Sequence, residues 1–223
     1  MRFRRCAAAL TAVLCCMSVW SCSSKAETPS SAVIHEDGAG DVIEPAEDDP
    51  EYNLGSYRIS AGGVKLYYEE ENYPTALLLY LEKLFGTYAA RDYDTYRSCI
   101  WPGYVEAMEE YLPKEFDYDL ATSFNNRCDS LEVDMGGSYK LTRIKAEVPE
   151  EDFSDAFFTQ LAPICGEDFG EKVKGEADNI YCVQLYIMVK NETDTDDQLF
   201  FKNTENGMGI VVVEKDGKYY AFC

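Results

Sequence analysis

Histidine and basic side chains are scarce in this chain of 223 residues. His35 is its single histidine, and 20 Lys and Arg stand against 41 Asp and Glu, which gives a net charge of −21. Affinity for nucleic acid comes mainly from clustered Lys and Arg, so we expect no nucleic-acid partner. Because 46% of the residues are hydrophobic, the chain has enough apolar side chains for a core and is not disordered throughout.

The lack of histidine after residue 35 excludes several kinds of active site. Residues 57–223 cannot by themselves form a Ser-His-Asp triad, a Cys-His pair or a His-ligated zinc or iron site. The glycine-rich loops that bind dinucleotides or nucleotide phosphates are also absent from the sequence. We therefore expect no metal and no cofactor, and we assign no catalytic residue.

Residues 1–21 have the layout of a secretory signal peptide. Three arginines lie within the first five residues, and the apolar run from Cys6 to Trp20 is short for a transmembrane helix. The sequence Val-Trp-Ser-Cys that ends at Cys22 resembles a bacterial lipobox, with Trp20 departing from the small residue usual there. The resemblance implies that Cys22 carries a diacylglyceryl group, whose two acyl chains would anchor the protein stably.

Two alternatives stay open for this amino terminus. The signal can be cleaved near Ser21 with Cys22 left as a thiol, or it can stay uncleaved as an anchor, and Cys16 is a weaker second acceptor. We expect an extracytoplasmic protein attached by lipid to a bacterial cell membrane. Its other partner is then an unknown small molecule or an envelope protein.

An acidic segment follows, so residues 22–56 are predicted to comprise the lipidated cysteine and a disordered tether. Residues 23–56 hold nine acids and one base, with scattered Ser, Pro, Gly and Ala and no regular period. Such a stretch buries too little apolar surface to offset the entropy of ordering, so we expect it to be extended. His35 lies here, where a solvated side chain is the expected state.

Residues 57–223 are predicted to form one α+β domain. Two short apolar runs around Gly62-Gly63 predict a hairpin. Helical periodicity predicts four helices, at 74–88, 93–100, 102–112 (ended by Pro113) and 118–133. Strand periodicity then predicts strands at 139–148, 180–189, 208–213 and 218–222, with a helix at 153–164. Asp216-Gly217 is a strong hairpin signal, so the sheet should be mostly antiparallel.

The domain resembles a known group of proteins in three places. These are the leucine-rich leading helix, the segment Tyr88–Tyr93, and the ending at 211–220 with valines, a turn and Lys-Tyr-Tyr. The layout is similar to that of small cell-surface lipoproteins with a nuclear transport factor 2-like fold. The resemblance implies helices packed across a curved sheet that forms a cone. The first hairpin and the region 150–178 depart from the simplest members.

The same resemblance implies an enzymatic alternative, because this fold hosts isomerases and dehydratases that use an acid and a tyrosine in the cone. The candidate side chains are Tyr80, Tyr88, Tyr104 and Tyr186, with Asp92 or Glu106. Tyrosines that fill the interface between helices and sheet are the commoner case. We therefore expect a non-catalytic binding module, with an enzyme or an accessory subunit of an envelope complex as alternatives.

Five cysteines lie in the domain, an odd number. Outside the membrane, disulfides are the natural expectation. The candidates are Cys99, Cys128, Cys165 and Cys223, while Cys182 lies within a strand and is expected to be a small buried side chain. Pairing stays open at this point, although Cys223 can link the last strand to a helix through Cys99 or Cys128.

Two further patterns have an ordinary structural explanation beside a functional one. The loop 191–197 (NETDTDD) can bind Ca²⁺ weakly or be a solvated acidic loop, since it lacks the glycine and distal Glu of a calcium loop. The aromatic side chains of Tyr96, Trp101 and Tyr104 can form a sugar-stacking surface or pack at a joint between helices. In both cases the structural alternative is expected.

Overall fold

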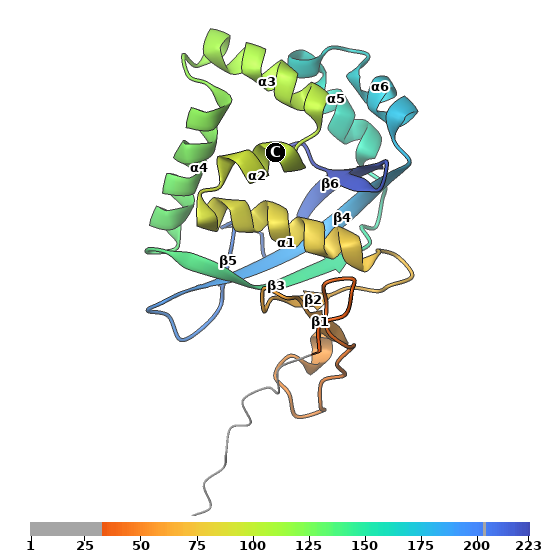
Figure 1. The fold of residues 1–223 in the computed structure, drawn as a ribbon, viewed down its shortest axis with the longest axis vertical. Helices are drawn as coiled ribbons and strands as arrows, with labels where there is room; N and C mark the ends of the chain where they lie inside the picture. The colour runs from red at the N-terminus through yellow and green to blue at the C-terminus, as the bar shows by residue number, and fades with distance from the viewer. Residues whose placement is uncertain (1–32, 203) are drawn as a thin grey trace, which may run out of the picture. The chain divides into compact units, whose positions relative to one another are not determined.

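The computed structural model describes residues 33–202 and 204–223. The predictions of a signal peptide, a lipobox and a lipidated Cys22 fall outside these residues. The structure is α+β, as the sequence predicts, with helices packed against an open sheet (Figure 1).

The sheet has seven strands in the order β1-β2-β3-β4-β6-β7, with β5 paired to β4 beside this path. Their bounds are β1 Tyr57–Ile59, β2 Lys65–Tyr67, β3 Tyr139–Glu147, β4 Asn179–Asn191, β5 Gln198–Leu199, β6 Met208–Lys215 and β7 Lys218–Tyr220. The pair β2–β3 is parallel and the other pairs are antiparallel. The prediction of a mostly antiparallel sheet is therefore confirmed.

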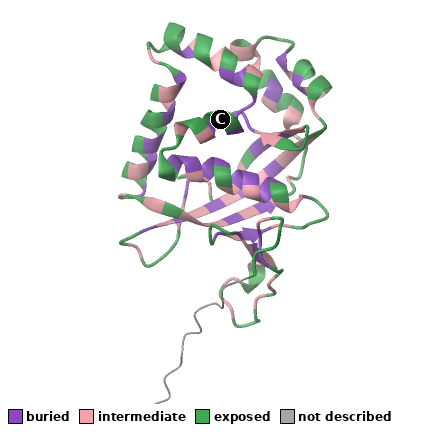
Figure 2. Cartoon of the chain, in the orientation of Figure 1, coloured by how far each residue is buried: buried purple, intermediate pink, exposed green. Residues whose placement is uncertain are grey.

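Six α-helices and one 3-10 helix occur in the described residues. Their bounds are η1 Tyr52–Leu54, α1 Thr75–Ala90, α2 Tyr93–Cys99, α3 Pro102–Glu115, α4 Leu120–Asp134, α5 Ser154–Cys165 and α6 Phe169–Glu176. Helix α1 packs against β3 on one side and against α2 and α4 on the other, while α5 packs against α3 and α6. The buried positions gather between the helices and the sheet (Figure 2).

Helix α1 forms where its apolar spacing predicts it. Its buried apolar and aromatic side chains are Leu77, Leu78, Tyr80, Leu81, Leu84, Phe85 and Tyr88. It ends at Arg91 in the left-handed conformation, and Asp92 then accepts a hydrogen bond from the Thr95 amide as the N-cap of α2. Asp119 caps α4 in the same way through the Thr122 amide.

The prediction that Pro113 ends the third helix is wrong, because α3 continues to Glu115. Proline removes one amide donor and crowds the preceding turn, which is costly in a helix interior. Here it lies in the last turn, and the Phe116 amide still donates to the Leu112 carbonyl. The helix therefore ends two residues after the proline.

Strand β4 lies in the middle of the sheet and supplies much of its buried face. Val183, Leu185, Ile187 and Val189 alternate inward with exposed fractions between 0 and 4%. Its neighbour β3 shifts register between Leu141 and Arg143, which explains the irregular alternation in that strand. The hairpin predicted at Asp216-Gly217 joins β6 to β7, with both residues at positive φ.

Aromatic rings fill the interior between the helices. Tyr88, Tyr96 and Phe124 lie with ring centroids 4.6 to 5.5 Å apart. Phe222 contacts the rings of Trp101 and Tyr104, and it also contacts rings from α5 and α6. Tyr96, Trp101 and Tyr104 are at most 8% exposed, so they pack at a joint between helices.

Residues 33–56 differ from the extended tether that the sequence predicts. Ala39 pairs with Ser60 and Ile43 with Tyr57 in isolated antiparallel bridges along the edge of β1. Arg58 is buried and donates to the Gly40 carbonyl at 2.7 Å. Backbone pairing and the buried Arg58 guanidinium thus attach residues 33–56 to the sheet, although their composition alone predicts a disordered segment.

Candidate functional site

The tyrosines proposed for an acid–tyrosine pair do not meet an acid in the interior. The buried Tyr80 hydroxyl donates to the Cys99 carbonyl at 2.8 Å, and burial raises its pKa well above the ordinary value. Asp92 is an exposed helix cap and Glu106 is exposed on α3. The chemistry of an Asp or Glu base beside a tyrosine is therefore not assembled from these residues.

The other two candidate tyrosines lie in different surroundings. Burial raises the pKa of Tyr104 to about 12. Tyr186 lies beneath the Lys145 ammonium, at 5.9 Å from the ring centroid, but burial and the Glu147 carboxylate raise its pKa. Tyr88 faces the Cys223 thiol and the Tyr96 hydroxyl, and burial raises its pKa as well. The pKa of all four tyrosines is therefore raised, so each is a weaker acid than a free tyrosine side chain.

The five domain cysteines are free thiols in the structure. Cys99 and Cys128 are buried, Cys165 and Cys182 are partly exposed, and Cys223 is exposed as a residue although its thiol lies against Tyr88. Cys99 and Cys223 come together where Ile100 bridges Ala221. The disulfide assignments stay a prediction, with this pair favoured by its position.

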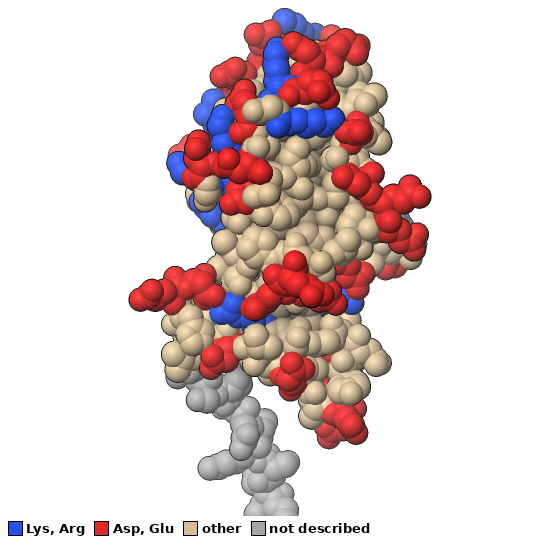
Figure 3. All heavy atoms as spheres, turned by 90° about the vertical axis from the view of Figure 1, so that its right-hand side faces the viewer, with Lys and Arg blue, Asp and Glu red and all other residues tan. Residues whose placement is uncertain are grey.

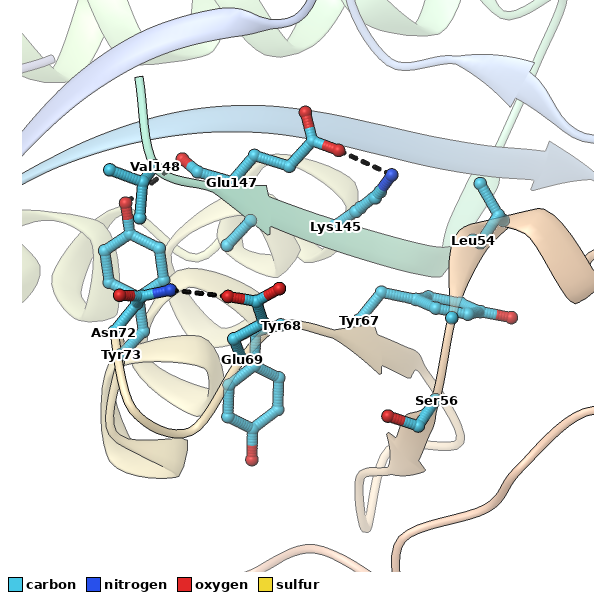
Figure 4. Close-up of a pocket in the computed structure, with 12 residues that line it drawn as sticks. Leu54, Ser56, Tyr67, Tyr68, Glu69, Asn72, Tyr73, Lys145, Glu147 and Val148 are labelled. Atoms are coloured by element: carbon cyan, nitrogen blue, oxygen red, sulfur yellow. Dashed lines mark hydrogen bonds and ion pairs between the residues drawn. The ribbon is translucent and has the colours of Figure 1, made fainter. Parts of the chain in front are cut away.

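One cavity that can hold a ligand lies at the end of β3, and we call it the tyrosine pocket (Figure 4). It has a volume of about 480 Å³. Its lining residues are Leu54, Gly55, Ser56, Tyr67, Tyr68, Glu69, Asn72, Tyr73, Lys145, Ala146, Glu147 and Val148. They come from the end of η1 and the residues after it, from the end of β2 and the loop before α1, and from the end of β3.

Two polar pairs face each other across the tyrosine pocket (Figure 4). On one side the Asn72 side-chain amide donates to Glu69 at 2.7 Å. On the other side Lys145 lies 2.6 Å from Glu147, whose pKa is lowered mainly by this hydrogen bond. The pocket thus combines two carboxylates, one ammonium and one amide, which leaves a net charge of −1 and both donors and acceptors of hydrogen bonds.

Tyr73 and Tyr67 fix the shape of this pocket. The Tyr73 hydroxyl donates to the carbonyls of Glu147 and Cys182, which ties the loop before α1 to β3 and β4. The Tyr67 hydroxyl donates to Glu51 at 2.9 Å, and Tyr67 lines the pocket. Both side chains are nearly fully buried, so this part of the pocket is formed before any ligand binds.

Basic side chains gather on the face of β2, β3 and β4 that lies away from α1. They are Lys65, Lys140, Arg143, Lys145 and Lys190, five of the sixteen bases in residues 57–223. Glu51 pairs with both Lys65 and Arg143, and Glu147 pairs with Lys145. Two acids therefore pair with three of the five bases on this face.

Hydrogen bonds within the acidic loop after β4 satisfy several of its groups. The Asn191 side-chain oxygen accepts from the amides of Thr193 and Asp194, both at 2.8 Å. Asp197 accepts from the Thr142 hydroxyl at 2.9 Å. Among residues 33–202 and 204–223, no group of three or more His, Cys, Asp or Glu side chains is arranged to hold a metal ion.

Comparison with protein-family models, with curated proteins and with solved structures found no match in any of the three. Among the described residues, no helix has the length and apolar character needed to cross a membrane. The case for a function therefore rests on the sequence and on the geometry of the site.

Proposed function

We propose that this protein is a bacterial lipoprotein, anchored through Cys22 at the extracytoplasmic side of the membrane, whose domain is a non-catalytic binding module. The cationic start, apolar run and lipobox-like Val-Trp-Ser-Cys support the anchor. The order of helices and the closing β6–β7 hairpin support a nuclear transport factor 2-like arrangement. A structural accessory subunit of an envelope complex would share this anchor.

We further propose that the tyrosine pocket binds a small, uncharged, polyhydroxylated molecule of the sugar class. The observation that carries this proposal is the mixture of hydrogen-bond donors and acceptors that Glu69, Glu147 and Lys145 supply around a partly aromatic cavity. A hydroxyl group both donates and accepts, so a polyol can satisfy ammonium, amide and carboxylate groups together. Tyrosine rings supply apolar surface to the C–H groups of such a ligand.

Non-catalytic binding is favoured over the isomerase or dehydratase alternative by the filled interior. An acid–base mechanism needs a carboxylate in an apolar cavity beside the reacting group. The tyrosines named for that role are surrounded by aromatic rings and backbone carbonyls, as described for Tyr80 and Tyr88. In the tyrosine pocket, the Glu147 carboxylate instead accepts a hydrogen bond from Lys145, which lowers its pKa and favours the charged form.

Metabolic labelling with radioactive palmitate tests the anchor. The wild-type protein should incorporate the label into its membrane fraction, and Cys22→Ala should lose it because the acceptor thiol is gone. Cys16→Ala is the matched control and should keep the label. Label that persists in Cys22→Ala would contradict the lipobox assignment.

Calorimetric titration of the purified mature protein with a panel of mono- and disaccharides tests the pocket. Binding should weaken about tenfold or more in Glu69→Gln, which removes a carboxylate from the pocket wall. Glu71→Gln removes the same charge from the exposed part of that loop, outside the pocket, and should bind normally. Equal affinities for the two variants, or no sugar bound, would oppose the proposal.

A further inference from the structure

A second cavity lies in an open groove between α1 and β3, distinct from the tyrosine pocket. Its volume is about 700 Å³, and most of its lining is apolar. The apolar side chains and small residues that line it are Ala61, Val64, Leu79, Gly86, Ala89, Ala90 and Leu141. The turn between β1 and β2 borders it as well, through Gly62. We call this cavity the α1–β3 groove.

Glu82 places a carboxylate in the α1–β3 groove. Its Oε1 atom accepts a hydrogen bond from the Ser60 hydroxyl at 2.8 Å. A Cβ on Gly62 would lie 2.3 Å from the same oxygen, so the backbone of the turn touches the carboxylate directly. Burial raises the pKa of Glu82, an effect that the Ser60 hydrogen bond only partly opposes. The Glu82 carboxylate is therefore fixed in position and only partly hydrated.

The basic groups near the groove do not neutralise this carboxylate. Lys83 and Lys140 line the rim and are exposed, and among the described residues neither forms an ion pair with Glu82. Exposed ammonium groups interact weakly through water with a bound ligand. A half-buried carboxylate beside apolar walls interacts more strongly with a cation that approaches it, because the local dielectric constant is lower.

We propose that the α1–β3 groove binds a small amphipathic amine, whose apolar body lies along α1 and whose ammonium group pairs with Glu82. The apolar walls of the groove favour binding because they bury apolar surface of the ligand away from water. The ammonium supplies the positive partner that Glu82 lacks. This site is independent of the sugar-binding site proposed for the tyrosine pocket, because the two cavities share no lining residue.

Titration of the mature protein with three probes of nearly equal size tests the ligand chemistry. The probes are 2-phenylethylamine, 2-phenylethanol and 3-phenylpropionate, which are cationic, neutral and anionic at pH 7. The amine should bind about tenfold or more tightly than the alcohol, since only the amine pairs with Glu82. Tighter binding of the carboxylate probe would mean that Lys83 and Lys140 dominate, and would overturn the proposal.

Two variants locate the binding site. Glu82→Gln keeps an acceptor for Ser60 and should remove the preference for the amine over the alcohol, whereas Glu106→Gln on the exposed surface of α3 should retain it. Gly86→Leu should fill the groove and abolish binding of both probes. A Cβ at position 86 meets Leu141 at an ordinary 3.8 Å, and leucine favours the helix more than glycine does.

Gly175→Leu is the matched control for Gly86→Leu. Gly175 also lies within a helix, α6, and a Cβ there meets nothing within 4 Å. This control should fold and bind the amine like the wild type. An amine preference that survives in Glu82→Gln, or binding that survives in a folded Gly86→Leu, would place the ligand elsewhere and refute the proposal.

Discussion

At the scale of single residues, two charged side chains attach the N-terminal segment to the sheet. Arg58 on β1 binds the Gly40 carbonyl and forms an ion pair with Asp37 at 2.8 Å. Glu51 receives hydrogen bonds from Lys65, Arg143 and Tyr67. Arg58 and Glu51 each join segments that are far apart in the sequence, so this stabilising role can be recognised only in the tertiary structure.

The Glu51 contacts should make the stability of this attachment depend on pH. Burial alone would raise the pKa of Glu51, but hydrogen bonds from Lys65 and Tyr67 outweigh burial and the pKa is lowered from 4.5. Its contribution is therefore complete above about pH 4.5 and is lost as the pH falls toward the lowered value in the folded state. Glu51→Gln should cost about 2 kcal/mol at pH 7.

Urea unfolding of the wild type and of Glu51→Gln between pH 7 and pH 3 measures this dependence. The difference in the free energy of unfolding should shrink as the solution becomes acidic. Glu47→Gln, a nearby exposed acid outside the ion pairs described here, serves as the control. A difference that stays constant down to pH 3 would mean that the charge of Glu51 does not stabilise the fold.

At the scale of the element, side-chain caps and apolar spacing place the helices accurately. Asp92 and Asp119 both accept from the amide three residues later, and each cap fixes where its helix begins. The sequence predicts β3 despite its irregular alternation, but it does not predict the short α6. A register shift breaks the alternation in β3, and α6 has only two buried side chains, Phe169 and Val173. Short elements carry too few periodic positions to be recognised.

Removing the cap of α4 tests how much this local signal contributes. Asp119→Ala should lower the free energy of unfolding by about 1 kcal/mol, because the Thr122 amide loses its acceptor. Asp119→Asn keeps an acceptor and should lose much less. Thermal or denaturant unfolding followed by circular dichroism gives both values. Equal losses in the two variants would show that charge, rather than the cap, matters at this position.

At the scale of the whole molecule, acidity is distributed over the domain. Residues 57–223 hold 32 acids and 16 bases, a net charge of −16. Acidic side chains outnumber basic ones on the face shown in Figure 3, where they gather in several clusters around uncharged surface. Such a surface favours solubility and attracts cations, which agrees with an ammonium ligand for the α1–β3 groove.

Shortening the chain tests where the folded domain begins. A chain of residues 57–223 should be less stable than one of residues 33–223 by at least about 2 kcal/mol, because it loses the Glu51 and Arg58 contacts. It also uncovers the edge of β1 that Ile43 and Ala39 pair with. Comparing the two by denaturant unfolding gives the difference. Equal stability of the two chains would mean that the folded domain begins at residue 57.

The sequence by itself determined the α+β class, the four leading helices, the central strand β4 and the final hairpin. These features follow from local periods, caps and turn residues, which act between near neighbours. Tertiary structure decided where the segment 33–56 packs, which tyrosines are enclosed, and that Glu82 meets Ser60 beside an apolar groove. Each of these depends on contacts between residues far apart in the chain, and no local pattern encodes such contacts.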